Sequence, residues 1–325
     1  MPKANYIRAM RDAMAEEMRR DPTVFLMGED VRFNMYGSSG GLLEEFGEDR
    51  VLDTPASEAG FVGAAAGAAM VGMRPIVDIT IAPFVYPAAD QIISIIAKSR
   101  YLYGGQARVP VVLRCCMLYN GASAAQHSDR PYPMFMNVPG LKIIAPSDAY
   151  DAKGLMKAAV RDDDPVMCFE DTTVWGRSME IPDEEYLIPI GKAAVKREGK
   201  DITIFAVAGA VPLAIAAADK LAGEGIDAEV IDPRTLKPLD TAAILASVAK
   251  TGRLVVVDPA HRTCSVASEV SAIVAEHGFH YLKAPILRVT TPDIHIPFSP
   301  VMEKGLYPTT DRIAEAVRRS MKEDA

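Results

Sequence analysis

The sequence predicts an α/β protein whose first domain contains a doubly wound, mainly parallel sheet and whose second, smaller domain is also α/β. Apolar runs typical of buried strands alternate with helical patterns along most of the 325 residues. The alternation stops between residues 172 and 189, where no clear periodicity is present, and then resumes. We therefore expect a first domain over residues 1–180, a linker over 181–194 and a second domain over 195–325.

Helical periodicity is clearest near the start, where Ile7, Met10, Met14 and Met18 define one face of a helix over Tyr6–Arg20. In the first domain we expect further helices at 42–46, from 58 onward, at 86–103 and at 151–161, and strands at 24–27, 51–52, 76–79, 109–113, 141–145 and 166–169. In the second domain we expect strands at 202–207, 228–231, 254–258 and 286–289, and helices at 212–223, 241–250, 265–277 and 312–321.

Composition and charge exclude several classes of protein. Hydrophobic residues make up 49% of the chain and charged residues 24%, which is ordinary for a soluble globular protein. The net charge of -8, without a long basic cluster, argues against a nucleic-acid partner or an anionic membrane surface. No apolar stretch reaches the length of a membrane span, and the N-terminal pattern has no apolar signal core. We expect a cytoplasmic protein with small-molecule or protein partners.

Four cysteines lack the spacing of metal ligands. Cys115, Cys116 and Cys168 lie in apolar, strand-like runs, where free thiols behave as small hydrophobic groups. Cys264 lies beside Arg262 in a loop-like segment and could be more reactive. Buried, reduced thiols are the better expectation for the first three.

The least ordinary stretch is the helix that begins at Glu58, with Ser57 as its N-cap. One side of this helix carries almost no side chain, because it is formed by Gly60, Gly63, Ala64, Gly67, Ala68 and Gly72. Glycine inside a helix costs about 1 kcal/mol relative to alanine, so this face favours close packing against another backbone. Glu58 is a lone acid on an apolar helix. Taken alone, it is most simply a solvated glutamate favoured by the helix dipole.

A long loop over residues 117–138 separates two predicted strands, and such loops inside compact domains are usually functional. It contains Gln126-His127-Ser128. A lone histidine in a loop is more often structural or exposed than catalytic, and both interpretations stay open on these residues alone.

A series of motifs occurs in one order along nearly the whole chain. They are Asp53-Thr54-Pro55-Ala56-Ser57-Glu58, Gly72-Met73-Arg74-Pro75, Asp90-Gln91, Gln126-His127-Ser128, Pro139-Gly140-Leu141-Lys142, Arg161-Asp162-Asp163-Asp164-Pro165, Asp232-Pro233-Arg234-Thr235-Leu236-Lys237-Pro238 and Thr251-Gly252-Arg253-Leu254. Each motif is weak, but together they resemble the β subunit of the thiamine-diphosphate-dependent first component of 2-oxoacid dehydrogenase complexes. That family includes the pyruvate, branched-chain and acetoin dehydrogenase β subunits.

The resemblance implies a pyrimidine-type, thiamine-diphosphate-binding domain with a doubly wound parallel sheet, followed by a transketolase C-terminal-like α/β domain. It also implies that this chain supplies only half of the cofactor site. The other half needs a Gly-Asp-Gly sequence to hold Mg²⁺ and the diphosphate, and this chain has none. An α subunit should therefore hold both, in an α2β2 heterotetramer.

Site residues are carried over from the family motifs. Glu58 would bond to the pyrimidine ring nitrogen of thiamine diphosphate and drive the tautomer that deprotonates the thiazolium carbon. Phe84 would pack on the pyrimidine face, although an ordinary core phenylalanine is the alternative. His127, flanked by the cofactor-binding Gln126, would lie near the thiazolium and help with the 2-oxoacid carboxylate or with acyl transfer.

The resemblance also implies a structural potassium ion bound by main-chain carbonyls around Val111, Ala159, Val160 and Asp162 and by Asp164. The alternative for Asp162-Asp163-Asp164 is a solvated acidic turn.

The expected activity is oxidative decarboxylation of a pyruvate-like or branched-chain 2-oxoacid, with acyl transfer to a lipoyl domain of the acyltransferase second component. Acetoin is the alternative substrate. The family pattern is altered at Asp129-Arg130-Pro131-Tyr132-Pro133 and at Arg114-Cys115-Cys116-Met117, which leaves the substrate open. The first of these changes also motivates a non-catalytic scaffold or regulatory subunit, against which an acidic Glu58 argues. A transketolase-like sugar enzyme is disfavoured by the missing diphosphate half.

Overall fold

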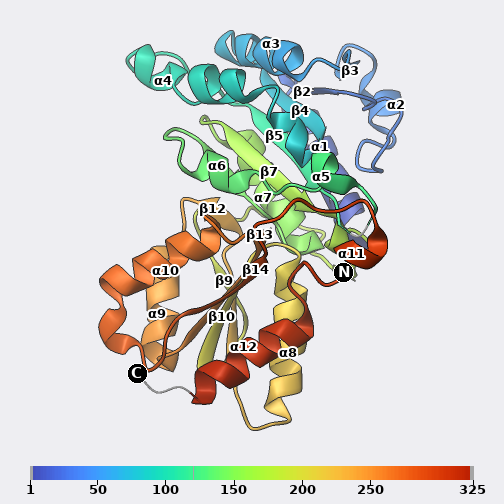
Figure 1. Ribbon diagram of the computed structural model, residues 1–325. Helices are drawn as coiled ribbons and strands as arrows, with labels where there is room; N and C mark the ends of the chain where they lie inside the picture. Colours follow the sequence, from blue (N-terminus) through green and yellow to red (C-terminus); the bar gives the residue numbers. More distant parts are fainter. Residues whose placement is uncertain (1–2, 120, 323–325) are drawn as a thin grey trace. The chain divides into compact units, whose positions relative to one another are not determined.

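A computed structural model describes residues 3–119 and 121–322 (Figure 1). The chain divides into two units. The first unit runs to residue 118 and continues over 134–190, and the second comprises 119–133 and everything from 191 onward. The start of the second unit at 191 falls inside the predicted linker. The segment 119–133, which the predicted boundaries place in the first domain, is grouped with the second unit.

The first unit alternates strands and helices as expected. Its strands are β1 (Lys3–Asn5), β2 (Val24–Gly28), β3 (Val51–Asp53), β4 (Arg74–Ile81), β5 (Val112–Met117), β6 (Lys142–Ile144), β7 (Val166–Asp171) and β8 (Ser178–Glu180). Its helices are α1 (Tyr6–Arg20), α2 (Leu42–Phe46), α3 (Glu58–Met70), α4 (Ser99–Leu102), α7 (Ala149–Arg161), the 3-10 helices η1 (Ala82–Val85) and η3 (Thr172–Val174) and the π-helix η2 (Gln91–Ile96). α6 (Tyr132–Met136) lies at the boundary between the two units.

The parallel sheet of this unit follows the order β6-β7-β5-β4-β2-β3. On one face α1 packs against α7, and on the other face α3 packs against β4 and η2. Chain order reverses between β2 and β4, because β3 lies on one side of β2 and β4 lies on the other. In open α/β sheets, ligands bind outside the carboxyl ends of the strands at such a switch point. The topology therefore indicates a candidate ligand site at the carboxyl ends of β2 and β4.

The first helix forms over the residues for which the periodic pattern predicts it. α1 begins at Tyr6 after Asn5, whose side chain accepts a hydrogen bond from the Arg8 amide. Met10, Met14 and Met18 are fully buried and pack into a core shared with α7 and the sheet. An amphipathic face buried against a sheet stabilises a helix more than propensity does.

The predicted helix over residues 86–103 is confirmed only in part. The segment contains a turn, the π-helix η2 and the short helix α4. Pro87 has no amide hydrogen to donate within the first turn, and the four isoleucines between 91 and 97 are β-branched and poor helix formers. Burial is also incomplete, since Ile92 and Ile96 are buried whereas Ile95 is 42% exposed.

The second unit is a smaller α/β sheet with the order β14-β13-β10-β11-β9. Its elements are α5 (Ala124–His127), β9 (Ala194–Arg197), β10 (Ile202–Ala206), α8 (Ala210–Ala222), β11 (Ala228–Asp232), β12 (Thr235–Lys237), α9 (Thr241–Thr251), β13 (Leu254–His261), α10 (Val266–His277), η4 (Phe279–Tyr281), β14 (Leu287–Thr291), α11 (Pro300–Glu303) and α12 (Thr310–Lys322). α8 packs against α12 and α9 against α10, and the two pairs cover opposite faces of the sheet (Figure 1).

The cysteines lie where the sequence predicted. Cys115, Cys116 and Cys168 are buried in strands and Cys264 is exposed. Within residues 3–119 and 121–322, no helix is long and apolar enough to cross a membrane.

Candidate active site

Glu58 is the first residue of α3, and Ser57 is the N-cap as predicted. The Ser57 side chain makes no capping hydrogen bond, however, so Ser57 marks the helix start by its non-helical backbone alone, with a φ of -156° and a ψ of 76°. Glu58 follows the short strand β3 and is partly buried. The helix therefore begins at the carboxyl edge of the sheet, one strand away from the switch point.

The carboxyl ends of β2 and β4 lie against each other at this edge. Gly28 is paired with Asp78, and a Cβ on Gly28 would lie 2.2 Å from the Asp78 carbonyl oxygen. Only glycine allows this approach. Just beyond it, Thr80 has a φ of 59°, a conformation that β-branched residues rarely adopt. Its amide donates to Asp78 Oδ1 at 2.8 Å. Such local strain is typical of functional edges.

Glu29, the residue after β2, is an acid that the sequence analysis did not single out. Its pKa is raised, first by burial and then by the negative charge of Glu58 and of two nearby aspartates. The Glu58 carboxylate at the start of α3 therefore lies close enough to influence the protonation of Glu29. An acid directly after a buried strand at the carboxyl edge was the signal that could have revealed Glu29.

Several buried polar atoms at this edge have no hydrogen-bond partner among the described residues. They are Glu29 Oε1 after β2, Thr54 Oγ1 after β3, Thr80 Oγ1 at the end of β4 and Gln91 Oε1 at the start of η2. Buried polar atoms are normally paired, because leaving one unpaired costs about 1–3 kcal/mol. Their concentration where three strands end indicates that a polar ligand completes the hydrogen bonding.

Phe84 belongs to η1, which continues directly from β4, and its side chain is partly buried. The structure thus places Phe84 near the end of the strand that carries Thr80. Both residues belong to the same unit as Glu58.

The bare face of α3 is not packed against another backbone in this chain. A Cβ added at Gly67 or Gly72 would meet nothing within 4 Å, and one at Gly63 would meet only the Gln91 side chain at 3.4 Å. The buried residues of α3 are instead Phe61, Val62, Ala65, Ala66 and Ala69, on the other face. The expected close packing is therefore absent from the described part of this chain, and Gly60, Ala64 and Gly67 are exposed.

A buried ion cluster lies in the middle strands of the same sheet. Arg114 Nη1 lies 2.6 Å from Asp78 Oδ2, and Arg114 Nε lies 2.8 Å from Glu170 Oε1. Burial alone would lower the pKa of Arg114, but the two carboxylates outweigh it and raise that pKa. The altered Arg114-Cys115-Cys116-Met117 segment is therefore strand β5, with its arginine committed to internal pairing.

His127 and Gln126 lie at the end of α5, in the segment grouped with the second unit. His127 is partly buried and Gln126 is exposed. The loop is held in an unusual backbone conformation, since Ala122 and Ala124 have φ values of 54° and 56°. Ser128 Oγ is buried without a hydrogen-bond partner in the described chain.

Two residues of the altered 129–133 segment anchor this loop within its own unit. The Arg130 guanidinium stacks over the rings of Tyr119 and Tyr307, at 3.7 and 4.5 Å from their centroids, and donates to the Ser128 carbonyl. The Tyr132 hydroxyl donates to the buried Asp258. Burial raises the pKa of Asp258, although hydrogen bonds from Tyr132 and from backbone amides oppose that shift. The departures from the family pattern therefore fix the histidine loop.

The predicted potassium ligands gather around one turn after α7. The Val111 carbonyl accepts from the Val166 amide at 3.0 Å, which brings β5 next to this turn. The carbonyls of Val160 and Asp162 accept hydrogen bonds from Arg74 Nη1 at 3.0 and 2.9 Å. Two of the expected oxygens thus already face a guanidinium.

The remaining expected ligands are partly used as well. The Ala159 carbonyl accepts from the Asp162 amide, and the Asp164 carboxylate is paired with Arg100 and Lys142. The described residues contain no cluster of three or more His, Cys, Asp or Glu side chains that could hold a metal ion.

Comparison with known domains defines the class of protein. Residues 2–173 match the transketolase pyrimidine binding domain and residues 191–313 match the transketolase C-terminal domain. A solved structure described as a split-gene transketolase, an inactive β4 tetramer, superposes with a TM-score of 0.80 over 98% of both chains, at 23% identity. The fold is thus that of the transketolase-like thiamine enzymes.

Three curated relatives identify the family within the transketolase-like enzymes. The chain is 45% identical to the β subunit of acetoin:2,6-dichlorophenolindophenol oxidoreductase of Bacillus subtilis, covering 98% of this chain and 97% of the relative. It is also 45% identical to the 2-oxoisovalerate dehydrogenase β subunit of the same organism, over 98% of each, and to the pyruvate dehydrogenase E1 β subunit of Rickettsia felis, over 96% of each. The chain belongs to the β-subunit family of the thiamine-diphosphate-dependent 2-oxoacid and acetoin dehydrogenases.

Proposed function

We propose that this chain is the β subunit of a 2-oxoacid dehydrogenase, active only together with an α subunit. The observation that carries the proposal is Glu58 at the carboxyl edge of the sheet, beside Glu29 and beside buried polar atoms that lack a partner. The similarity to β subunits of oxidoreductases extends over nearly the full chain.

The donor set at this edge fits an aminopyrimidine. Such a ring needs an acid at a ring nitrogen, an acceptor for its amino group and an apolar surface against its face. Glu58 would supply the acid, and the unpaired oxygens of Glu29 and Thr80 are available as further partners. Phe84 would supply the apolar surface, and the exposed Gln126 stays a proposed cofactor contact.

Thiamine diphosphate, when bound, supplies a thiazolium carbon that attacks the substrate carbonyl and stabilises the negative charge left by decarboxylation. The role proposed for Glu58 is to exchange a proton with the pyrimidine ring nitrogen, which is general acid–base work by a carboxyl group. Glu29 has a raised pKa, so it holds a proton more readily than an exposed glutamate and supports proton exchange at Glu58.

His127 is proposed to bind the carboxylate of the 2-oxoacid or to assist transfer of the acyl group to a lipoyl domain of the acyltransferase component. The anchoring of its loop through Arg130 and Tyr132 supports this role, because a catalytic side chain needs a fixed backbone. Orienting His127 is thus the role that we assign to the altered segment 129–133, in place of a scaffold function.

A partner must hold Mg²⁺ and the diphosphate, since this chain has neither a Gly-Asp-Gly sequence nor, among its described residues, a metal cluster. We propose an α2β2 heterotetramer. The bare, exposed face of α3 and the exposed Val71 and Tyr101 are surfaces suited to burial against another subunit.

Potassium binding at residues 111 and 159–164 stays a proposal. The gathered carbonyls favour it, but a bound ion would share two oxygens with Arg74. Replacing potassium chloride with choline chloride at equal ionic strength should lower the thermal midpoint if the ion binds there. The domain boundaries at 180 and 195 likewise stay a proposal.

Acetoin is the second candidate substrate, because the acetoin-oxidising, 2-oxoisovalerate and pyruvate relatives are equally similar at 45% identity. Identity therefore does not choose among them. The altered segments at Arg114 and at 129–133 face internal partners and provide no further discrimination.

The test is dye-linked oxidation of pyruvate, branched-chain 2-oxoacids and acetoin by this chain co-expressed with its α partner. Glu58→Gln should lower thiamine-dependent kcat by about 100-fold or more, since general acid–base catalysis contributes about 10²–10⁴. Glu44→Gln, the same change at an exposed glutamate of α2, should leave the rate unchanged. An assembled wild-type complex that oxidised none of these substrates, or a Glu58→Gln variant with full activity, would refute the proposal.

A further inference from the structure

The second unit contains a cavity that is separate from the residues assigned to catalysis. It has a volume of about 300 Å³ and lies along β14, the last strand in the order β14-β13-β10-β11-β9. One side of β14 pairs with β13, and the cavity follows its other, outer side together with the facing surface of α12. Pockets for small ligands begin at about this size.

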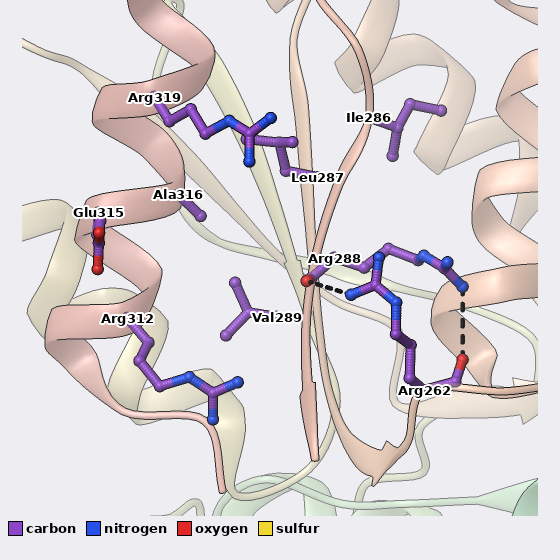
Figure 2. A pocket seen from close by; sticks show the side chains of 9 residues that line it. All are labelled: Arg262, Ile286, Leu287, Arg288, Val289, Arg312, Glu315, Ala316 and Arg319. Carbon is purple, nitrogen blue, oxygen red and sulfur yellow. Dashed lines mark hydrogen bonds between the residues drawn. The ribbon is translucent and has the colours of Figure 1, made fainter. Parts of the chain in front are cut away.

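Four arginines line the cavity (Figure 2). Arg312 and Arg319 extend from α12 toward β14, while Arg288 is on β14 itself and Arg262 follows β13. Leu287 and Val289 point toward α12 and form an apolar floor between the two groups. Guanidinium groups from three separate elements therefore surround one space.

Three arginines of this cluster have no acidic partner among the described residues. Of the described residues that line the cavity, Glu315 is the one acid, and it is exposed to solvent. Among the described residues, Arg262, Arg288 and Arg312 form no ion pair with a carboxylate. By contrast, Arg318 on the same helix forms two short hydrogen bonds with Glu224. A chain with a net charge of -8 thus keeps three arginines without a carboxylate partner, among its described residues, at one cavity.

Hydrogen bonds to backbone carbonyls hold these guanidinium groups in place. Arg312 donates to the carbonyls of Leu306, Tyr307 and Thr290 at 3.0, 2.7 and 2.8 Å. Its pKa is lowered by burial, which shows that the cation is partly removed from water without a compensating acid. An anion in the cavity would relieve this cost.

The Arg262 and Arg288 side chains form the other half of the cluster. Each points a guanidinium nitrogen at the other's carbonyl, at 3.5 and 3.4 Å (Figure 2). Arg288 also donates to Ser268 Oγ at 2.9 Å. Two like charges are thus kept close together, an arrangement that a bound anion stabilises.

The outer edge of β14 is poorly suited to a peptide strand. A strand that added to this edge would need the carbonyls of Arg288 and Thr290, and these already accept from Arg262 and Arg312. Guanidinium forks, in contrast, match the geometry of phosphate oxygens. The contacts therefore favour a compact anion over an acidic peptide.

We propose that the cavity between β14 and α12 is a binding site for a small polyanion carrying phosphate groups, held by Arg262, Arg288, Arg312 and Arg319. The site is independent of the function proposed above, because none of these residues has a role in it. The phosphate groups could belong to an inorganic polyphosphate or to a phosphorylated metabolite, and both present the same chemistry to the arginines.

The test is isothermal titration calorimetry of the full-length chain with pyrophosphate, adenosine diphosphate, orthophosphate and citrate. Arg262→Gln and Arg319→Gln remove one cation from each side of β14, and neither interrupts the backbone contacts of Arg312. Arg318→Gln is the matched control, since it makes the same charge change on the same helix outside the cavity.

We expect saturable binding of pyrophosphate with one site per chain, weakened about ten-fold by Arg262→Gln and by Arg319→Gln and unchanged by Arg318→Gln. Equal affinity for pyrophosphate and adenosine diphosphate would show that only phosphates are recognised, and tighter binding of the nucleotide would show that a phosphorylated metabolite is the ligand. Absence of binding, preference for citrate, or equal weakening by Arg318→Gln would overturn the proposal.

Discussion

Replacing Arg114 with methionine should destabilise the first unit strongly. Arg114 is 4% exposed and pairs with Asp78 and Glu170, whose side chains are 11% and 1% exposed. Methionine retains much of the apolar stem but leaves two carboxylates buried without a counter-charge. Breaking a buried pair by removing one partner costs about 3–5 kcal/mol. With an m value of about 3 kcal/mol/M, the urea midpoint should fall by about 1 M or more.

The stability lost by Arg114→Met should depend on pH in a defined direction. Burial already raises the pKa of Glu170 with Arg114 present, and removing the arginine removes the charge that opposes this shift, so the pKa of Glu170 should rise further. A group whose folded pKa is raised binds its proton more tightly in the folded protein, so its destabilising effect is absent at low pH and grows as the pH rises through the folded pKa. The difference between wild type and Arg114→Met should therefore be smaller at about pH 5 than at about pH 8.

The chain provides its own probe for this measurement. Trp175 is the single tryptophan and lies in the first unit, so its fluorescence in urea reports on the unit that contains Arg114. Arg108→Met is the control, because Arg108 is exposed and its pair with Asp163 should contribute less than about 1 kcal/mol. The protein concentration is held constant, since association would stabilise the folded chain.

A triple variant separates lost pairing from lost packing. Asp78→Asn and Glu170→Gln, combined with Arg114→Met, remove all three charges while keeping the side-chain volumes. If unpaired charge is the cause, this variant should recover more than half of the stability lost by Arg114→Met alone. A loss below about 1 kcal/mol for Arg114→Met, or no recovery in the triple variant, would refute the reasoning.

Three further outcomes are expected. Glu16→Gln removes the carboxylate that bridges two buried lysines of α7, so urea unfolding at about pH 7 should show a free energy of unfolding lower by about 2 kcal/mol. This difference should shrink toward about pH 3, because those lysines lower the pKa of Glu16 despite its burial. A difference that grew on acidification would contradict this. Tyr132→Phe removes a donor to buried Asp258 and should cost about 1–2 kcal/mol by circular dichroism in urea, whereas an unchanged midpoint would argue against a buried bond. A thiol reagent should label only Cys264 in the native chain and all four cysteines in denaturant. The reason is that burial raises the pKa of the other three thiols. Rapid labelling of a second thiol in the native chain would disprove their burial.

Much of the fold could be predicted from local patterns. The bounds of α1 and α2 and the start of α3 at Glu58 agree with the periodicity and the N-cap signal. The irregular helix over residues 86–103 has a local cause as well, because Pro87 and a run of isoleucines weaken the α-helical preference that apolar content alone suggested. Periodicity detects which face is buried but not which helical hydrogen-bonding pattern is formed.

The candidate site was only partly accessible from the sequence. Glu58, Phe84 and His127 were predicted from motifs and stay predictions, whereas Glu29, Arg130 and Tyr132 were not assigned roles. The pKa of Glu29 is raised by burial and then by the charge of Glu58, which is 29 positions away in the sequence and comes close because β2 and β3 are adjacent parallel strands. Spacing along the chain carries no information about such a pair.

The sequence by itself determined the order of elements, the separation into two α/β parts and the motifs that mark the family, because these depend on local periodicity and on residue identity. Tertiary structure alone decided which charges pair, which polar atoms stay unpaired at the carboxyl edge and which helix face is left bare. These properties arise between segments far apart in the chain. Parallel strands bring such segments together through hydrogen-bond register, and burial then determines how strongly their charges interact.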